Sequence, residues 1–206
     1  MPDVRSLKAL QLDALREVAN IGAGHAATAL SQLTDRRIMI SVPEINVTRI
    51  EDLPDLFGNA EDIVAAVLMH MLGDLTGRTL LLFPDEDARM LCDLLMRKNP
   101  GHTTDFDELA QSSLKEAGNI LGGAYMNALS DFMGMMLLPS VPSLVVDLAG
   151  AVVTSTLLNF SQERDYVLCV ETEFFFQDAE KSLLGHFLLL PDVPSLQAIF
   201  DAIRVS

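Results

Sequence analysis

The feature that most constrains this chain is an internal repeat, in which one segment returns after about one hundred residues. LREVANIGAGHAA at 15–27 is similar to LKEAGNILGGAYMNA at 114–128. Four positions in and around these stretches have identical spacings of 4, 3 and 23 residues. They are Asp13, Glu17, Asn20 and Pro43 in the first copy and Ser112, Glu116, Asn119 and Pro142 in the second. Such self-similarity predicts two halves with the same structure.

The order of predicted elements also recurs, which gives repeats at about 6–100 and 104–206. The first half is expected to contain a helix to residue 33, a strand over 36–47 interrupted by proline, a short helix or loop at 50–58, a hairpin over 62–83 and a helix over 84–98. The second half is expected to contain a helix over 105–131, an extended stretch over 135–144, a helix near 147–160, a hairpin over 165–190 and a closing helix. No linker rich in Gly, Ser or Pro separates the halves. We therefore expect a single α+β domain with pseudo-two-fold symmetry, a shared and largely antiparallel sheet, and the two long motif-bearing helices on the outside.

The repeated polar residues share one face of each long helix. Positions i, i+4, i+7 and i+11 lie on the same side of a helix. The first stripe is therefore Asp13, Glu17, Asn20 and Gly24, and the second is Ser112, Glu116, Asn119 and Gly123. Apolar residues occupy the opposite faces, so each stripe is predicted to face solvent or a partner.

Each stripe is accompanied by glycines, although a glycine inside a helix costs about 1 kcal/mol relative to alanine. Gly22 and Gly122 lie on the inner faces, where we expect them to permit tight packing between helices. Gly24 and Gly123 lie beside the polar residues, where bare backbone would let a partner approach.

Composition disfavours several classes of partner. The formal net charge is −15, from 14 basic and 29 acidic residues, and it disfavours binding to nucleic acid or an anionic membrane. No apolar run reaches the roughly 18 residues of a membrane helix, and MPDVRSLKAL lacks the layout of a signal peptide. We therefore expect a cytoplasmic protein.

The sequence gives only weak signals for redox, metal or dinucleotide-binding sites. Cys92 and Cys169 have no CxxC spacing and are interpreted as reduced core thiols. The four histidines have no metal-ligand spacing, so no metal site is expected. GAGHAA fits a dinucleotide-loop pattern, but a helical pattern precedes it where a strand is required.

A carboxylate and a carboxamide one helical turn apart can position a reaction but cannot attack a substrate. The amide donates and accepts hydrogen bonds at once, which suits holding a water molecule, and the carboxylate pairs with a cation. Neither group is a nucleophile, and no His, Cys or Ser with a base partner lies near either motif. Each stripe is therefore half of an active site, and the docking molecule must supply the rest.

The doubled pattern, with NIGAGHAATALS beginning at the first asparagine, resembles the CheC branch of the CheC/CheX/FliY family of chemotaxis phosphatases. The likeness spans nearly the whole chain. Such proteins dephosphorylate the response regulator CheY, whose aspartyl phosphate lies beside a bound Mg²⁺ and a lysine of CheY itself. The resemblance therefore implies no cofactor of the protein's own, with Mg²⁺ present in the bound CheY.

The resemblance also implies roles for the matched residues. Asn20 and Asn119 would enter the CheY active site and orient the attacking water, while Glu17 and Glu116 would pair with the CheY lysine. The supporting positions would be Asp13 and Ser112 at the edge of the contact, Gly24 and Gly123 beside the approaching partner, and Pro43 and Pro142 in the strand next to each helix.

Two other functions are alternatives to this one. A non-catalytic adaptor that binds CheY or the receptor deamidase CheD would use the stripes only for docking. CheD is also a possible partner of a phosphatase, on resemblance alone. The middle domain of FliM shares the fold but lacks the Glu/Asn pairs, so the intact pairs favour catalysis. A small-molecule hydrolase is disfavoured because the sequence shows neither a nucleophile nor a metal-ligand set.

Overall fold

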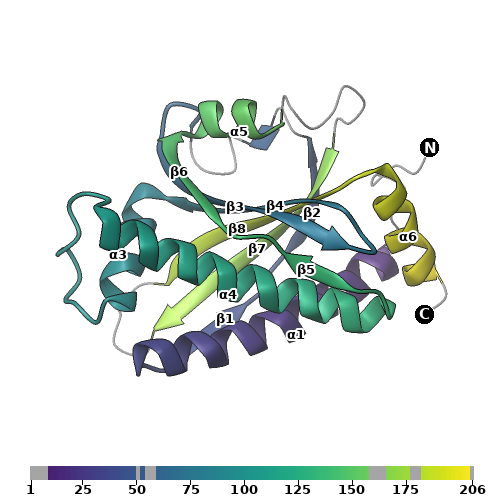
Figure 1. Cartoon of the computed structure of the whole chain (residues 1–206), viewed down its shortest axis with the longest axis horizontal. Coiled ribbons are helices and arrows are strands. Elements are labelled where there is room, and N and C mark those ends of the chain that lie inside the picture. The colour runs from purple at the N-terminus through teal and green to yellow at the C-terminus, as the bar shows by residue number, and fades with distance from the viewer. Residues whose placement is uncertain (1–8, 50–51, 54–58, 158–165, 177–181, 205–206) are drawn as a thin grey trace.

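One sheet flanked by helices organises the chain, as Figure 1 shows for the computed structural model. The structure describes residues 9–49, 52–53, 59–157, 166–176 and 182–204. The first half contains α1 (Ala9–Thr34), β1 (Ile38–Ser41), β2 (Ile45–Arg49), β3 (Ile63–Gly73), β4 (Gly77–Pro84) and α3 (Asp85–Leu95). The second half contains α4 (Glu108–Met133), β5 (Leu137–Pro139), β6 (Ser143–Leu148), α5 (Ala149–Leu157), β7 (Tyr166–Phe176), β8 (Leu183–Pro191) and α6 (Val193–Arg204).

These elements confirm most of the sequence-based expectations. Both long helices and both hairpins are present, and the strand expected over 36–47 is divided into β1 and β2 on either side of Pro43. The helix expected from residue 105 begins at Glu108 instead, because the Asp107 side chain caps it by accepting a hydrogen bond from the Ala110 N–H at 2.8 Å. Most of the segment 50–58, expected as a short helix or loop, lies outside the described residues.

The eight strands form one antiparallel sheet in which the two halves exchange their edge strands. The order is β1-β7-β8-β4-β3-β5, with β2 also paired to β7 and β6 also paired to β3. Strands β1 and β2 of the first half therefore extend the hairpin of the second half, and β5 and β6 extend the hairpin of the first. The two hairpins meet at the centre, where β4 pairs with β8. This arrangement confirms the predicted shared antiparallel sheet.

The core lies on both faces of the sheet, because successive side chains of a strand point to opposite sides. On β4, Leu81 and Phe83 join the larger cluster beneath α1, α3 and α4. The alternate residues Leu80 and Leu82 join the smaller cluster that contains Val152 of α5. Figure 1 shows α1 and α4 side by side across one face, while α5 lies apart from them. The two motif helices therefore share one layer.

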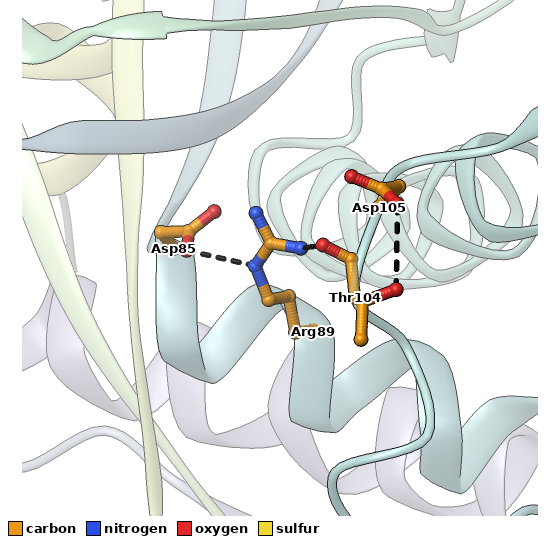
Figure 2. A network of polar contacts seen from close by, with 4 residues as sticks. All are labelled: Asp85, Arg89, Thr104 and Asp105. Carbon is orange, nitrogen blue, oxygen red and sulfur yellow. Dashed lines mark hydrogen bonds and ion pairs between the residues drawn. The ribbon is translucent and has the colours of Figure 1, made fainter.

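The connection between the halves is fixed by polar contacts from α3, and Figure 2 shows part of this network. Arg89 donates to the Asp85 carboxylate at 2.8 Å and to the Thr104 carbonyl, and its guanidinium lies 4.8 Å from the centre of the Phe106 ring. The hydrogen bond with Asp85 raises the pKa of Arg89. The fully buried Asp93 accepts from the Thr103 N–H at 2.8 Å and from its hydroxyl at 2.6 Å. These contacts hold the chain leading into α4, and with it the second motif.

The inner glycines of the two motif helices have different neighbours. A Cβ on Gly22 would lie 2.7 Å from the Tyr125 ring and 3.0 Å from the Tyr125 Cα, so this glycine lets α1 approach α4, as predicted. The same prediction for Gly122 is wrong. A Cβ there would lie 2.2 Å from the Met69 methyl group of β3, so Gly122 lets α4 approach the sheet. Gly118 does the same against Val67.

Replacing Gly22 with alanine is expected to destabilise the protein. The added methyl group would contact the Tyr125 backbone as well as its ring, so the two helices would have to separate. Overpacking of this kind costs about 1–3 kcal/mol, which exceeds the gain of about 1 kcal/mol in helix propensity. Urea unfolding of Gly22→Ala should show the lower stability.

Gly24→Ala is the matched control, because a Cβ at Gly24 would meet nothing within 4 Å. Its unfolding free energy is expected to rise by up to about 1 kcal/mol from helix propensity alone. Equal changes in stability for the two variants would show that the α1–α4 contact does not depend on bare backbone at Gly22.

Candidate functional site

Both predicted polar stripes face outward. Asp13, Glu17 and Asn20 are exposed on α1, and Ser112, Glu116 and Asn119 are exposed on α4. The opposite side of each helix fills the core with Leu15, Val18 and Ala19 in α1 and with Leu114, Ala117 and Leu121 in α4. The amphipathic pattern therefore sets the orientation of both stripes, as the sequence predicted.

The two asparagines point to opposite sides of the helix pair. Asn20 lies two residues before Gly22, about 200° around the helix from the side that contacts α4. Asn119 lies about 140° from Ala124 and about 120° from Tyr125, the residues that contact α1. Since α1 packs on β1, β2 and β7 while α4 packs on β3, β5 and β6, each amide faces the sheet edge on its own side. A molecule docked on one stripe therefore leaves the other accessible.

The amide of Asn20 is held against the chain that joins β1 to β2. Its nitrogen donates to the Arg16 carbonyl at 3.0 Å, and its oxygen accepts from the Val42 N–H at 3.4 Å. Arg16 in turn donates to the Asp13 carboxylate at 3.0 Å, which forms an ion pair between two exposed side chains. The first site is thus a carboxylate, an amide and an ion pair on two successive turns of α1, next to Pro43.

Val42 and Arg16 are contacts that the sequence analysis missed. The constant distance from each asparagine to its proline was the available signal, because the residue before Pro43 is the one that reaches Asn20. A spacing alone does not say which backbone group makes the contact.

The second site has the same glutamate and asparagine, with Ser112 in place of Asp13, in a more open arrangement. Within the described part of the chain, the side chains of Ser112, Glu116 and Asn119 make no hydrogen bond or ion pair. A Cβ on Gly123 would meet nothing within 4 Å, as at Gly24 in the first site. Pro142 lies between β5 and β6, as Pro43 lies between β1 and β2. Space for an approaching molecule is therefore present beside both stripes.

The described residues offer few other reactive groups. They contain no cluster of three or more His, Cys, Asp or Glu side chains that could hold a metal ion. Burial lowers the pKa of His186 to about 4, so this imidazole is neutral near pH 7. Burial raises the pKa of Cys92 to about 11 and that of Cys169 to about 12, so neither thiol forms a nucleophilic thiolate at neutral pH. None of the described helices is long and apolar enough to cross a bilayer.

The two cysteines are predicted to resist alkylation in the folded protein. Both are buried, and their raised pKa values keep the reactive thiolate scarce. Iodoacetamide at pH 8 should modify neither residue of the native protein and both residues in urea, as measured by mass spectrometry. Rapid native labelling of either cysteine would contradict the burial described above.

The sequence profile of the CheC-like family matches residues 10–47 and 109–146, which contain both stripes. The chain is 38% identical over 202 residues to the CheY-P phosphatase CheC of Bacillus subtilis, and this alignment covers 97% of each chain. It is also 30% identical over 131 residues to the flagellar motor switch phosphatase FliY of Bacillus subtilis, covering 63% of this chain and 34% of that protein.

A solved structure has the same fold. The crystal structure of Thermotoga maritima FliY superposes with a TM-score of 0.81 at 21% identity, and the match covers 97% of this chain and 98% of that one. The sheet with exchanged edge strands and the paired helices are therefore an arrangement found in an experimentally determined protein.

Proposed function

The chain belongs to the CheC-like family, and from this premise we propose that it hydrolyses the aspartyl phosphate of the response regulator CheY. The observation that carries the proposal is the pair of exposed Glu/Asn stripes on opposite sides of the helix layer. The Bacillus subtilis relative that is 38% identical is named as a CheY-P phosphatase. Such a phosphatase would act in chemotaxis signalling in the cytoplasm.

In the proposed reaction the asparagine amide orients a water molecule for attack on phosphorus. The phosphorus–oxygen bond to the aspartyl group breaks, which releases inorganic phosphate and restores the carboxylate of CheY. An amide group has two N–H donors and two acceptor lone pairs. Asn20 uses one of each on Arg16 and Val42, so one donor and one acceptor remain to fix the water. Asn119 would perform the same task in the second site.

The neighbouring carboxylates are proposed to fix the docked position. Glu17 and Glu116 lie three residues before each asparagine, on the same exposed face, where they would pair with the lysine of CheY. Asp13 and Ser112 would contact the edge of the partner, and the open backbone at Gly24 and Gly123 would let it approach. Pro43 and Pro142 would shape the chain next to each amide.

The remaining chemistry would come from the regulator. Mg²⁺ bound in CheY would neutralise the phosphoryl oxygens, and the protein itself would require no cofactor. Positioning by the two side chains is then the enzyme's contribution, and positioning alone can supply a large rate enhancement. The net charge of −15 is compatible with this division of roles between enzyme and regulator. The cations that would stabilise the phosphate, Mg²⁺ and a lysine, belong to CheY.

Changing both asparagines to alanine should abolish most of the activity. Loss of the oriented water is expected to reduce phosphate release from phosphorylated CheY by about 100-fold in Asn20→Ala/Asn119→Ala. Each single variant should retain the activity of its intact site, because the two amides face opposite flanks. Asn99→Ala, at an exposed position between α3 and α4 and outside both motif helices, is the matched control and should leave the rate unchanged.

The same variants separate catalysis from adaptor function. An adaptor of CheY or CheD would never accelerate phosphate loss, whether or not its asparagines are intact. Binding of CheY that carries beryllium fluoride, a phosphate mimic, can be measured in parallel by calorimetry. Binding without turnover in the unmodified protein would support the adaptor, and full turnover in the double variant would exclude the proposed role of the asparagines.

A further inference from the structure

The two sites differ at the residue that precedes each proline. Val42 and Val141 occupy equivalent positions, 22 residues after their asparagines. Val42 is only 5% exposed and belongs to the main core, whereas Val141 is 89% exposed. The same residue type is therefore buried in one copy and presented to solvent in the other.

The buried valine shows where this position lies relative to the amide. The Val42 N–H donates to the Asn20 oxygen, so the residue before the proline is adjacent to the proposed catalytic amide in the first site. In the second half, α4 packs against both β5 and β6, the strands that flank Val141. The turn that contains Val141 thus lies on the side of α4 toward which Asn119 points. Within the described residues, no hydrogen bond joins this turn to the side chain of Asn119.

Hydrogen bonds hold the turn that presents Val141. The Ser140 N–H donates to the His70 carbonyl at 2.9 Å, and the His70 N–H donates to the Ser140 hydroxyl oxygen at 2.9 Å. The same hydroxyl lies 3.2 Å from the Val141 carbonyl, and Pro142 restricts the backbone that follows. A side chain on such a turn loses little conformational freedom when a partner covers it.

We propose that Val141 is a docking contact peculiar to the second site, where it packs against an apolar patch of the docked CheY beside the phosphorylated pocket. This inference rests on the proposed function. The first site has no corresponding contact, because Val42 is turned into the core and its backbone positions Asn20 instead. Burying one valine side chain typically strengthens binding by about tenfold.

The test places Val141→Asp in two backgrounds. In Asn20→Ala only the second site remains active, and the substitution is expected to raise the KM for phosphorylated CheY about tenfold with little change in kcat. In Asn119→Ala only the first site remains active, and the same substitution should change neither constant. Because Val141 is already exposed, the unfolding free energy should stay the same, which urea unfolding can verify.

Met39→Asp is the control for added negative charge. Met39 is 53% exposed on β1 and lies outside both stripes. In the Asn20→Ala background it should leave KM unchanged. No rise in KM for Val141→Asp in that background, or an equal rise in both backgrounds, would overturn the proposal.

Failure of the inference can be told apart from failure of the proposed function. If the unmodified protein does not accelerate phosphate loss, the proposed function fails. Calorimetry with CheY bearing beryllium fluoride then still tests the contact in a protein whose first site is also impaired for docking, Glu17→Ala/Asn20→Ala, where Val141→Asp should weaken binding about tenfold. Unchanged binding there would reject the role of Val141.

Discussion

The contact of Tyr125 with Gly22 is the constraint on which the placement of both sites depends. The ring of Tyr125 occupies the space that a side chain at Gly22 would need, and its centre lies 4.7 Å from that of Phe187 on β8. Its hydroxyl shares a buried hydrogen bond of 2.9 Å with Thr172 on β7. One residue thus ties α4 to both α1 and the sheet. With the rotation of the two helices fixed in this way, the asparagines on their far sides must face outward.

The pseudo-symmetry of the fold does not make the two sites equivalent. The first site has an exposed ion pair between Asp13 and Arg16, which contributes little to stability but orients two charges beside Glu17. The second site has Ser112 and Lys115 at these positions. The side-chain amide of Asn20 is also held by two backbone groups, while the side-chain amide of Asn119 makes no hydrogen bond to the described residues. Duplication therefore preserved the Glu/Asn pair while its surroundings diverged.

Much of the architecture could be predicted from the sequence, because helical periodicity and turn residues are local signals. They defined the long helices, the hairpins and the outward direction of the stripes. The exchange of β1, β2, β5 and β6 between the halves could not be predicted, since a repeat predicts similar halves but does not specify which strands pair across them. The error at Gly122 has the same origin. An inner glycine can face a helix or a sheet, and only the packing of Met69 decides between them.

The central claim is that an asparagine on the surface of a helix reaches into the phosphorylated pocket of another protein. A crystal structure of this chain bound to CheY with Mg²⁺ and beryllium fluoride would test it most directly. The account predicts the amide of Asn20 or Asn119 within hydrogen-bonding distance of a water molecule in line with the bond from beryllium to the aspartyl oxygen. A complex in which CheY docks elsewhere and both amides remain in solvent would contradict it.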